Sequence, residues 1–185
     1  RQLLAEDWLL RRAHLTPDRI ALRDADSKKA WSFQEINDRA EALAGIFVKK
    51  GIQTGDRVAL LSPNHIAYFD FFFACWKIGA IFVPLNWRLA QKELICIMDN
   101  CSPKLLGIHM SSDFDPNMIR IPVMPIDSGY DVAINTAVRA NMEPSWDDVP
   151  IMTIYTGGTT GQPKGVLLTK QNIIANAVNT IISWA

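Results

Sequence analysis

Short apolar runs alternate along this chain with longer segments whose apolar residues recur at helical spacing. Strand-like runs cover residues 57–61, 81–83, 104–108 and 151–155, and helical patterns cover residues 32–50, 63–79 and 91–100. Parallel strands need a crossover of a dozen or more residues, usually a helix, whereas antiparallel strands can be joined by a tight turn. The alternation therefore predicts an α/β fold with a mostly parallel sheet flanked by helices.

Local signals place the ends of some of these elements. Ser32 followed by Glu35 is a capping-box pattern, which predicts that a helix begins there, and Gly51 is expected to end that helix. Thr169 is the candidate N-cap of a last helix over residues 171–184.

The pattern is less regular between residues 111 and 150. Residues 119–126 are expected to form an edge strand, because Pro122 and Pro125 would interrupt a central ladder of hydrogen bonds. Residues 130–141 are compatible with either a helix or a loop.

The helix predicted over residues 63–79 has an aromatic and aliphatic face, which is interpreted as core packing. The side chains on that face are Ile66, Phe69, Phe72, Phe73 and Trp76. The apolar stretch that continues into the next strand is interrupted by Asp70, Lys77 and Pro84. These interruptions favour a buried helix leading into a strand over a membrane span.

Composition excludes several classes of function. The chain has 185 residues, 49% of them hydrophobic, with 19 basic and 19 acidic side chains, so no broad nucleic-acid footprint or polybasic membrane surface is expected. Cys75, Cys96 and Cys101 form no paired motif and are interpreted as buried free thiols of a reducing, cytoplasmic compartment. The three histidines show no ligand spacing, so no metal site within the chain is expected.

One glycine-rich segment, residues 153–166, has the composition of a phosphate-binding loop. It fits neither the Walker A pattern nor the dinucleotide fingerprint. Glycines let a backbone approach a ligand closely, successive N–H groups can converge on an anion, and threonine hydroxyls add donors. The candidate phosphate-binding residues are Thr156, Gly157, Gly158, Thr159, Thr160, Gly161 and Lys164. A surface hairpin with a structural glycine loop is the alternative. Against it, the loop is expected to span residues 156–165, far longer than a two-residue turn.

The same segment resembles the signature of the acyl-adenylate-forming superfamily, which includes acyl-CoA synthetases, peptide-synthetase adenylation domains and firefly luciferase. The family pattern Tyr-Thr-Ser-Gly-Thr-Thr-Gly-x-Pro-Lys-Gly-Val aligns with residues 155–166. Residues 55–64 and 77–89 resemble earlier segments of the same family. Two departures are Gly157, where the family usually has serine, and Lys170, where histidine is frequent.

The resemblance implies a two-step ligase reaction. A carboxylic acid reacts with Mg²⁺-bound ATP to give an acyl-adenylate and pyrophosphate, and a thiol, usually coenzyme A, then takes the acyl group. Lys164 is implied to be a catalytic residue, because its charge would stabilise the departing pyrophosphate. The residues 84–89, Pro-Leu-Asn-Trp-Arg-Leu, favour a fatty-acyl or related acid–CoA ligase.

The resemblance also implies how the protein is organised. Residues 1–185 are expected to be a single N-terminal fragment: the first subdomain of the large domain of an adenylate-forming enzyme, without the rest of that domain or the small C-terminal domain. Such a fragment is expected to be inactive alone. Two alternatives stay open: a non-catalytic nucleotide-binding module, and a peptide-synthetase type of adenylation domain. The oligomeric state is also open.

Overall fold

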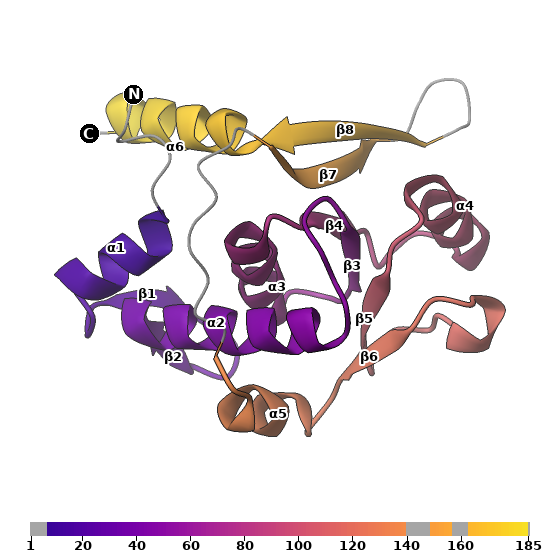
Figure 1. Ribbon diagram of the computed structural model, residues 1–185, viewed down its shortest axis with the longest axis horizontal. Coiled ribbons are helices and arrows are strands. Elements are labelled where there is room, and N and C mark those ends of the chain that lie inside the picture. Colours follow the sequence, from indigo (N-terminus) through magenta and orange to yellow (C-terminus); the bar gives the residue numbers. More distant parts are fainter. Residues whose placement is uncertain (1–6, 140–148, 157–162, 185) are drawn as a thin grey trace.

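A six-stranded sheet forms the centre of the protein, as shown in Figure 1. The computed structural model describes residues 7–139, 149–156 and 163–184. In spatial order the strands are β6 (Val123–Ile126), β5 (Leu105–His109), β3 (Arg57–Leu61), β4 (Ile81–Leu85), β7 (Pro150–Thr156) and β8 (Lys164–Thr169). A separate antiparallel pair, β1 (Ile20–Arg23) and β2 (Ala30–Ser32), lies outside this sheet.

The sheet is parallel except at one edge. The pairs β3–β4, β3–β5, β5–β6 and β4–β7 are parallel, the last through a single bridge between Phe82 and Met152. By contrast, β7 and β8 form an antiparallel hairpin, so β8 is an edge strand. The predicted mostly parallel sheet is confirmed, and the antiparallel exception lies at the glycine-rich segment.

Helices cover both faces of this sheet. Along β3, Val58 and Leu60 belong to one buried cluster, which contains side chains of α2 (Phe33–Lys49), α3 (Ala67–Ile78) and α5 (Tyr130–Thr136). The alternate residues Ala59 and Leu61 belong to a second cluster with α4 (Gln91–Cys101). Side chains alternate between the two faces of a strand, so a wholly apolar strand such as β3 can be buried on both.

Two predicted helix starts are confirmed. In α2, Ser32 accepts a hydrogen bond from the Glu35 backbone, and the Glu35 carboxylate accepts one from the Ser32 backbone. At α6 (Lys170–Trp184), the Thr169 hydroxyl accepts from the backbone N–H of Asn172. The third start differs from the prediction, because residues 63–65 form a loop and α3 begins only at Ala67.

The first helix, α1 (Trp8–Leu15), is tied to the rest of the structure by a buried lysine. Asp7 caps α1 by accepting from the Leu10 backbone, and its second carboxylate oxygen lies 2.6 Å from the ammonium of Lys77 in α3. That ammonium also donates to Asn37 in α2, so one side chain joins three helices.

Three other sequence predictions need correction. Phe69 is 41% exposed, whereas its neighbour Phe71 is fully buried, because α3 turns that face towards α2 and the sheet. Cys96 is exposed on α4, although Cys75 and Cys101 are buried as predicted. The predicted edge strand begins only at Val123, after a short 3₁₀ helix at Pro116–Met118, and the ambiguous segment contains α5.

Among the described residues, none of the helices is both long and apolar enough to cross a membrane.

Candidate functional site

The glycine-rich segment joins the two strands of the edge hairpin. The pairing of β7 with β8 continues to Thr156 opposite Lys164, so the connection begins at Gly157 and ends at Pro163. The prediction of a loop over residues 156–165 is therefore wrong at both ends. Ladder hydrogen bonds come from the backbone and continue through polar and glycine residues that carry no apolar signal. Five predicted binding residues lie outside the described part of the chain: Gly157, Gly158, Thr159, Thr160 and Gly161.

The two predicted residues that the structure describes, Thr156 and Lys164, lie together at the mouth of the hairpin. They are direct cross-strand partners, and both are exposed. Opposed residues of an antiparallel pair project to the same face, with Cβ atoms about 5 Å apart. The Thr156 hydroxyl and the Lys164 ammonium therefore project from the same face of the hairpin, next to the loop. Within the described ranges, the Lys164 ammonium forms no ion pair.

On the other face of the hairpin, an aromatic side chain holds the two strands against α4. Tyr155 pairs with Gly165, and a Cβ atom built on Gly165 would lie 3.0 Å from the Tyr155 Cζ atom. The Tyr155 ring packs against the buried cluster around α4, and its hydroxyl donates to the Asn100 side-chain oxygen at 2.5 Å. Burial raises the pKa of Tyr155 to about 12, so the hydroxyl stays protonated at neutral pH.

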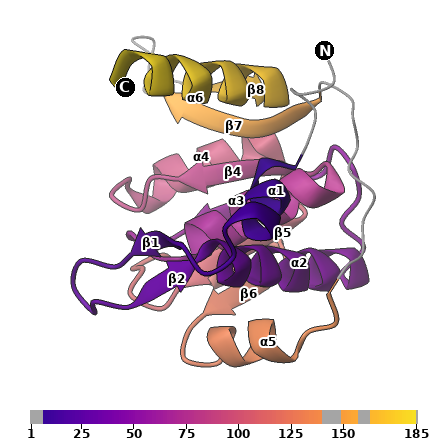
Figure 2. The same cartoon turned by 90° about the vertical axis from the view of Figure 1, so that its left-hand side faces the viewer.

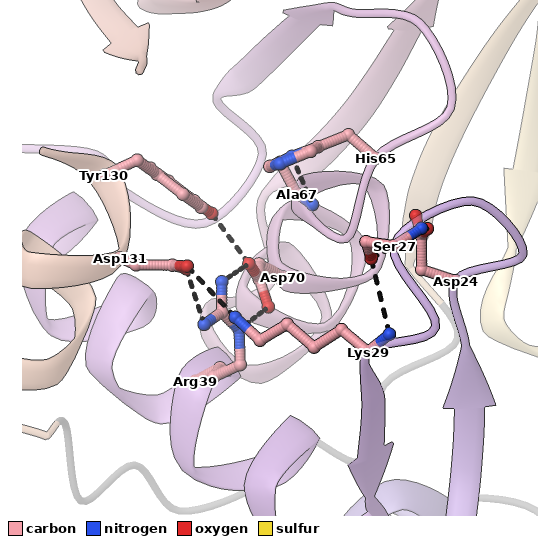
Figure 3. A network of polar contacts seen from close by, with 9 residues as sticks. All are labelled: Asp24, Ser27, Lys29, Arg39, His65, Ala67, Asp70, Tyr130 and Asp131. Atoms are coloured by element: carbon pink, nitrogen blue, oxygen red, sulfur yellow. Dashed lines mark hydrogen bonds and ion pairs between the residues drawn. The ribbon is translucent and has the colours of Figure 1, made fainter. Parts of the chain in front are cut away.

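A buried ionic network, shown in Figure 3, joins α2, α3 and α5. The Arg39 guanidinium donates two hydrogen bonds to Asp70, at 2.9 and 2.7 Å, and one to Asp131 at 2.9 Å. The Tyr130 hydroxyl donates to Asp70 at 2.9 Å, and the Lys29 ammonium lies 3.3 Å from Asp131. Figures 1 and 2 both place α5 at the opposite end of the molecule from the β7–β8 hairpin. The network therefore packs helices together at a distance from the β7–β8 hairpin.

Two histidines lie close together beyond the carboxyl ends of β3 and β5. The ring centroids of His65 and His109 are 5.2 Å apart. Each Nδ1 atom is a hydrogen-bond acceptor, from the backbone N–H of Ala67 and of Ser111 respectively. Burial and the neighbouring His109 lower the pKa of His65. Because the Nδ1 atom of His65 accepts from the Ala67 N–H, the neutral form of that ring carries its proton on Nε2.

A groove of about 400 Å³ opens at the carboxyl ends of β4 and β5. Its polar and aromatic lining comes from two loops and the start of α4, and includes Trp87, Arg88, Gln91, Ser111, Ser112 and Asp113. Ligands of open α/β sheets bind outside the carboxyl ends of the strands. In the sequence, Trp87 and Arg88 stand out only as part of the segment 77–89 that resembles the family, and nothing local marks the serines as their neighbours.

The comparison with known proteins decides the family. The sequence pattern of the AMP-binding enzyme family matches residues 9–184, almost the whole chain. The chain belongs to the AMP-binding enzyme family. The expected resemblance is confirmed, and the match includes the edge hairpin with Thr156 and Lys164.

Two relatives of the chain within this family are named as coenzyme A ligases. A feruloyl-CoA synthase of an Amycolatopsis species is 35% identical over an alignment of 182 residues that covers 95% of this chain and 35% of the relative. A 2-succinylbenzoate–CoA ligase of Bacillus cereus is 32% identical over 178 residues, which are 96% of this chain and 35% of the relative. The chain thus spans about a third of the length of these relatives.

Solved AMP-binding enzymes share the fold. An O-succinylbenzoate coenzyme A synthetase of Bacillus subtilis in complex with AMP aligns with a TM-score of 0.83 at 27% identity, over 97% of this chain and 46% of that one. A fatty acyl CoA synthetase of Mycobacterium tuberculosis aligns with a TM-score of 0.75 at 26% identity, over 91% of this chain and 35% of that one. The predicted fold class is therefore confirmed.

Proposed function

We propose that this chain is the N-terminal part of an AMP-forming carboxylic acid–CoA ligase, and that its β7–β8 hairpin holds the β- and γ-phosphates of ATP. The observation that carries the proposal is the pairing of Thr156 with Lys164, which brings an exposed hydroxyl and an exposed ammonium to the mouth of the signature loop. The names of the relatives, feruloyl-CoA synthase and 2-succinylbenzoate–CoA ligase, support the class of reaction.

In the first step, a carboxylate oxygen of the acid attacks the α-phosphorus of ATP. A P–O bond forms to the acyl group, the bond to the bridging oxygen breaks, and pyrophosphate leaves with the negative charge. Lys164 stabilises that charge as it develops, and Thr156 donates a hydrogen bond to a phosphate oxygen. In the second step, the thiol of coenzyme A displaces AMP, the acyl group passes to sulfur, and the thiol proton is released.

Magnesium is proposed to be bound by the phosphates of the nucleotide and not by side chains of the hairpin. The described strands of the hairpin, 150–156 and 164–169, contain no carboxylate side chain. Mg²⁺ keeps several water ligands and commonly binds through substrate phosphates. We therefore propose that it arrives with ATP, where its charge and that of Lys164 act on the same phosphates.

The acid is proposed to be a fatty acid or a related carboxylate, as the segment 84–89 suggests. The relatives named for ferulate and 2-succinylbenzoate favour a second candidate, an aromatic acid. A panel of fatty acids of increasing chain length, ferulate and 2-succinylbenzoate, assayed by ATP–pyrophosphate exchange, separates the two candidates.

Residues 1–185 alone are proposed to lack turnover, because the chain spans about a third of the length of its relatives. Pyrophosphate release by the isolated chain with any acid would refute this. Binding of ATP without exchange in the full-length protein would instead favour the non-catalytic module.

The decisive experiment is Lys164→Ala in the full-length protein, measured by ATP–pyrophosphate exchange. Removing a group that stabilises developing charge lowers rates by about 100-fold or more, and a loss of this size is expected here. Lys104→Ala is the matched control, because Lys104 is also an exposed lysine near the end of a strand. Unchanged exchange in Lys164→Ala would contradict the phosphate role.

A further inference from the structure

Both strands that lead into the loop are fixed by one side chain. In strands, successive residues point to opposite faces, so Tyr155 and Gly165 face α4, whereas Thr156 and Lys164 face away from it. Because Thr156 follows Tyr155 in one strand and Lys164 precedes Gly165 in the other, a movement of the hairpin at Tyr155 would displace the Thr156 hydroxyl and the Lys164 ammonium together.

The Tyr155 ring reaches its place only because residue 165 has no side chain. A Cβ atom at Gly165 would meet the Tyr155 Cζ at 3.0 Å, its hydroxyl oxygen at 3.2 Å and the Thr153 Cγ2 at 2.9 Å. Such distances are shorter than ordinary van der Waals contacts. An aromatic ring that covers a glycine of an edge strand also fixes the register of the two strands.

Beyond the hairpin, the ring is held by α4. The Tyr155 hydroxyl donates to Asn100, a residue of the last turn of α4 that lies 55 positions away in the sequence. The ring also packs against the buried cluster to which α4 contributes Leu94, Ile97, Met98 and Cys101. Tyr155 thus ties the hairpin to α4, in addition to the β4–β7 bridge and the packing of Ile151 against Trp76 of α3.

We propose that Tyr155 is a positioning residue for the adenylation step: through Asn100 and across Gly165 it sets where Lys164 meets the phosphates of ATP. The inference rests on the function proposed above. It assigns a role to Tyr155 and Gly165, which contact each other across the hairpin.

The test uses two variants that remove the same hydrogen bond from opposite sides, Tyr155→Phe and Asn100→Ala, in the full-length protein. One hydrogen bond of ordinary strength corresponds to about a 2- to 10-fold change. Each variant is expected to raise the KM for MgATP in pyrophosphate exchange by that factor. The KM for the carboxylic acid and the melting temperature should stay as in the wild type.

Two matched variants on α4 sharpen the test. Asp99→Ala changes the neighbouring exposed residue of the same helix turn and should leave the KM for MgATP unchanged. Asn100→Asp keeps an oxygen that can accept from the Tyr155 hydroxyl and should restore a KM close to that of the wild type. A rise with Asp99→Ala as large as with Asn100→Ala would mean that the effect is not specific to this contact and would overturn the inference.

A double-mutant cycle with Lys164→Ala separates this inference from the proposed function. If Tyr155 acts through Lys164, Tyr155→Phe has no further effect once Lys164 is alanine. An equal effect in both backgrounds, or wild-type kinetics for Tyr155→Phe and Asn100→Ala, would overturn the positioning role alone. Wild-type kinetics for Lys164→Ala would overturn the phosphate role itself and this inference with it.

Discussion

At the scale of single residues, the paired histidines illustrate how neighbours set a protonation state. The Nδ1 atom of His65 accepts from the Ala67 backbone in the first turn of α3, where the helix end carries partial positive charge. His109 and Arg39 oppose a proton on His65, whereas Asp70 and Asp131 favour one. Burial and His109 prevail, and the pKa of His65 is lowered in the folded state.

The lowered pKa predicts a pH dependence of stability. In the unfolded chain, His65 takes up a proton near pH 6.5, whereas in the folded state it does so only at a lower pH. Acidification from pH 7 to pH 5 therefore shifts the equilibrium towards unfolding. His65→Asn keeps an acceptor for the Ala67 N–H but cannot protonate. Urea unfolding at both pH values should show a smaller loss of stability for His65→Asn than for the wild type. The exposed His14→Asn serves as control, and equal losses in all three proteins would contradict the prediction.

The candidate binding residues of the glycine-rich segment could be named from the sequence because they lie next to one another in the chain. Thr156 and Lys164 were predicted as binding residues, and the structure brings them together as cross-strand partners. Their assignment to phosphate stays a prediction. The contact of Tyr155 with Asn100 could not be predicted, because no local pattern links residues 55 positions apart.

At the scale of elements, helix starts show how much a short pattern can specify. The capping box of α2 is complete, with Ser32 and Glu35 satisfying each other's backbone N–H groups. Its contribution comes from groups within four residues and needs no tertiary contact. The start of α3 was predicted too early because the loop 63–65 is held by contacts with distant residues, such as the tilted contact of the His65 ring with the His109 ring.

Ser32→Ala should therefore destabilise the protein by about 1 kcal/mol, since one of the free N–H groups of α2 loses its acceptor. Denaturant unfolding measures the change. Glu35→Gln keeps an acceptor in the capping box and is expected to change stability by only a few tenths of a kcal/mol. If the two variants were equally stable, the cap would not contribute as proposed.

Strand ends were less predictable than helix starts. The apolar pattern ended β7 at residue 155 and began β8 at residue 166, whereas backbone pairing extends through Thr156, Lys164 and Gly165. Backbone hydrogen bonds form wherever two strands are held side by side, and side-chain hydrophobicity does not report them.

At the scale of the whole molecule, the Arg39–Asp70 pair joins two helices that cover the same face of the sheet. Arg39 comes from α2 and Asp70 from α3, and their side chains are 8% and 0% exposed. Tyr130 and Asp131 bring α5 to the same point. A buried charge is tolerated only where oppositely charged or hydrogen-bonding groups surround it. In the described part of the chain, each buried polar side-chain atom has a hydrogen-bond partner.

Asp70→Asn should destabilise the fold by about 3 kcal/mol, because it removes the fully buried counter-ion of Arg39 and leaves only Asp131, whose side chain is 46% exposed, to balance the charge. The surface pair of Arg139 with Asp38 provides the control, since Arg139→Ala removes an exposed ion pair and should change stability by less than about 1 kcal/mol. Both are measured by denaturant unfolding at neutral pH. The double variant Arg39→Leu, Asp70→Leu should be more stable than Asp70→Asn. Equal destabilisation by Asp70→Asn and Arg139→Ala would refute this account.

The sequence by itself determined the α/β class, the cap of α2 and the membership of the AMP-binding enzyme family, because each depends on neighbouring residues or on a regular period. Only the tertiary structure decided that the signature closes an antiparallel edge hairpin, that Tyr155 crosses Gly165 to reach Asn100, and that Asp70 is the buried partner of Arg39. The contacts of Tyr155 with Asn100 and of Arg39 with Asp70 join residues 55 and 31 positions apart. Such contacts stabilise the protein only when the two segments lie side by side, and the packing of the sheet and helices determines which segments do so.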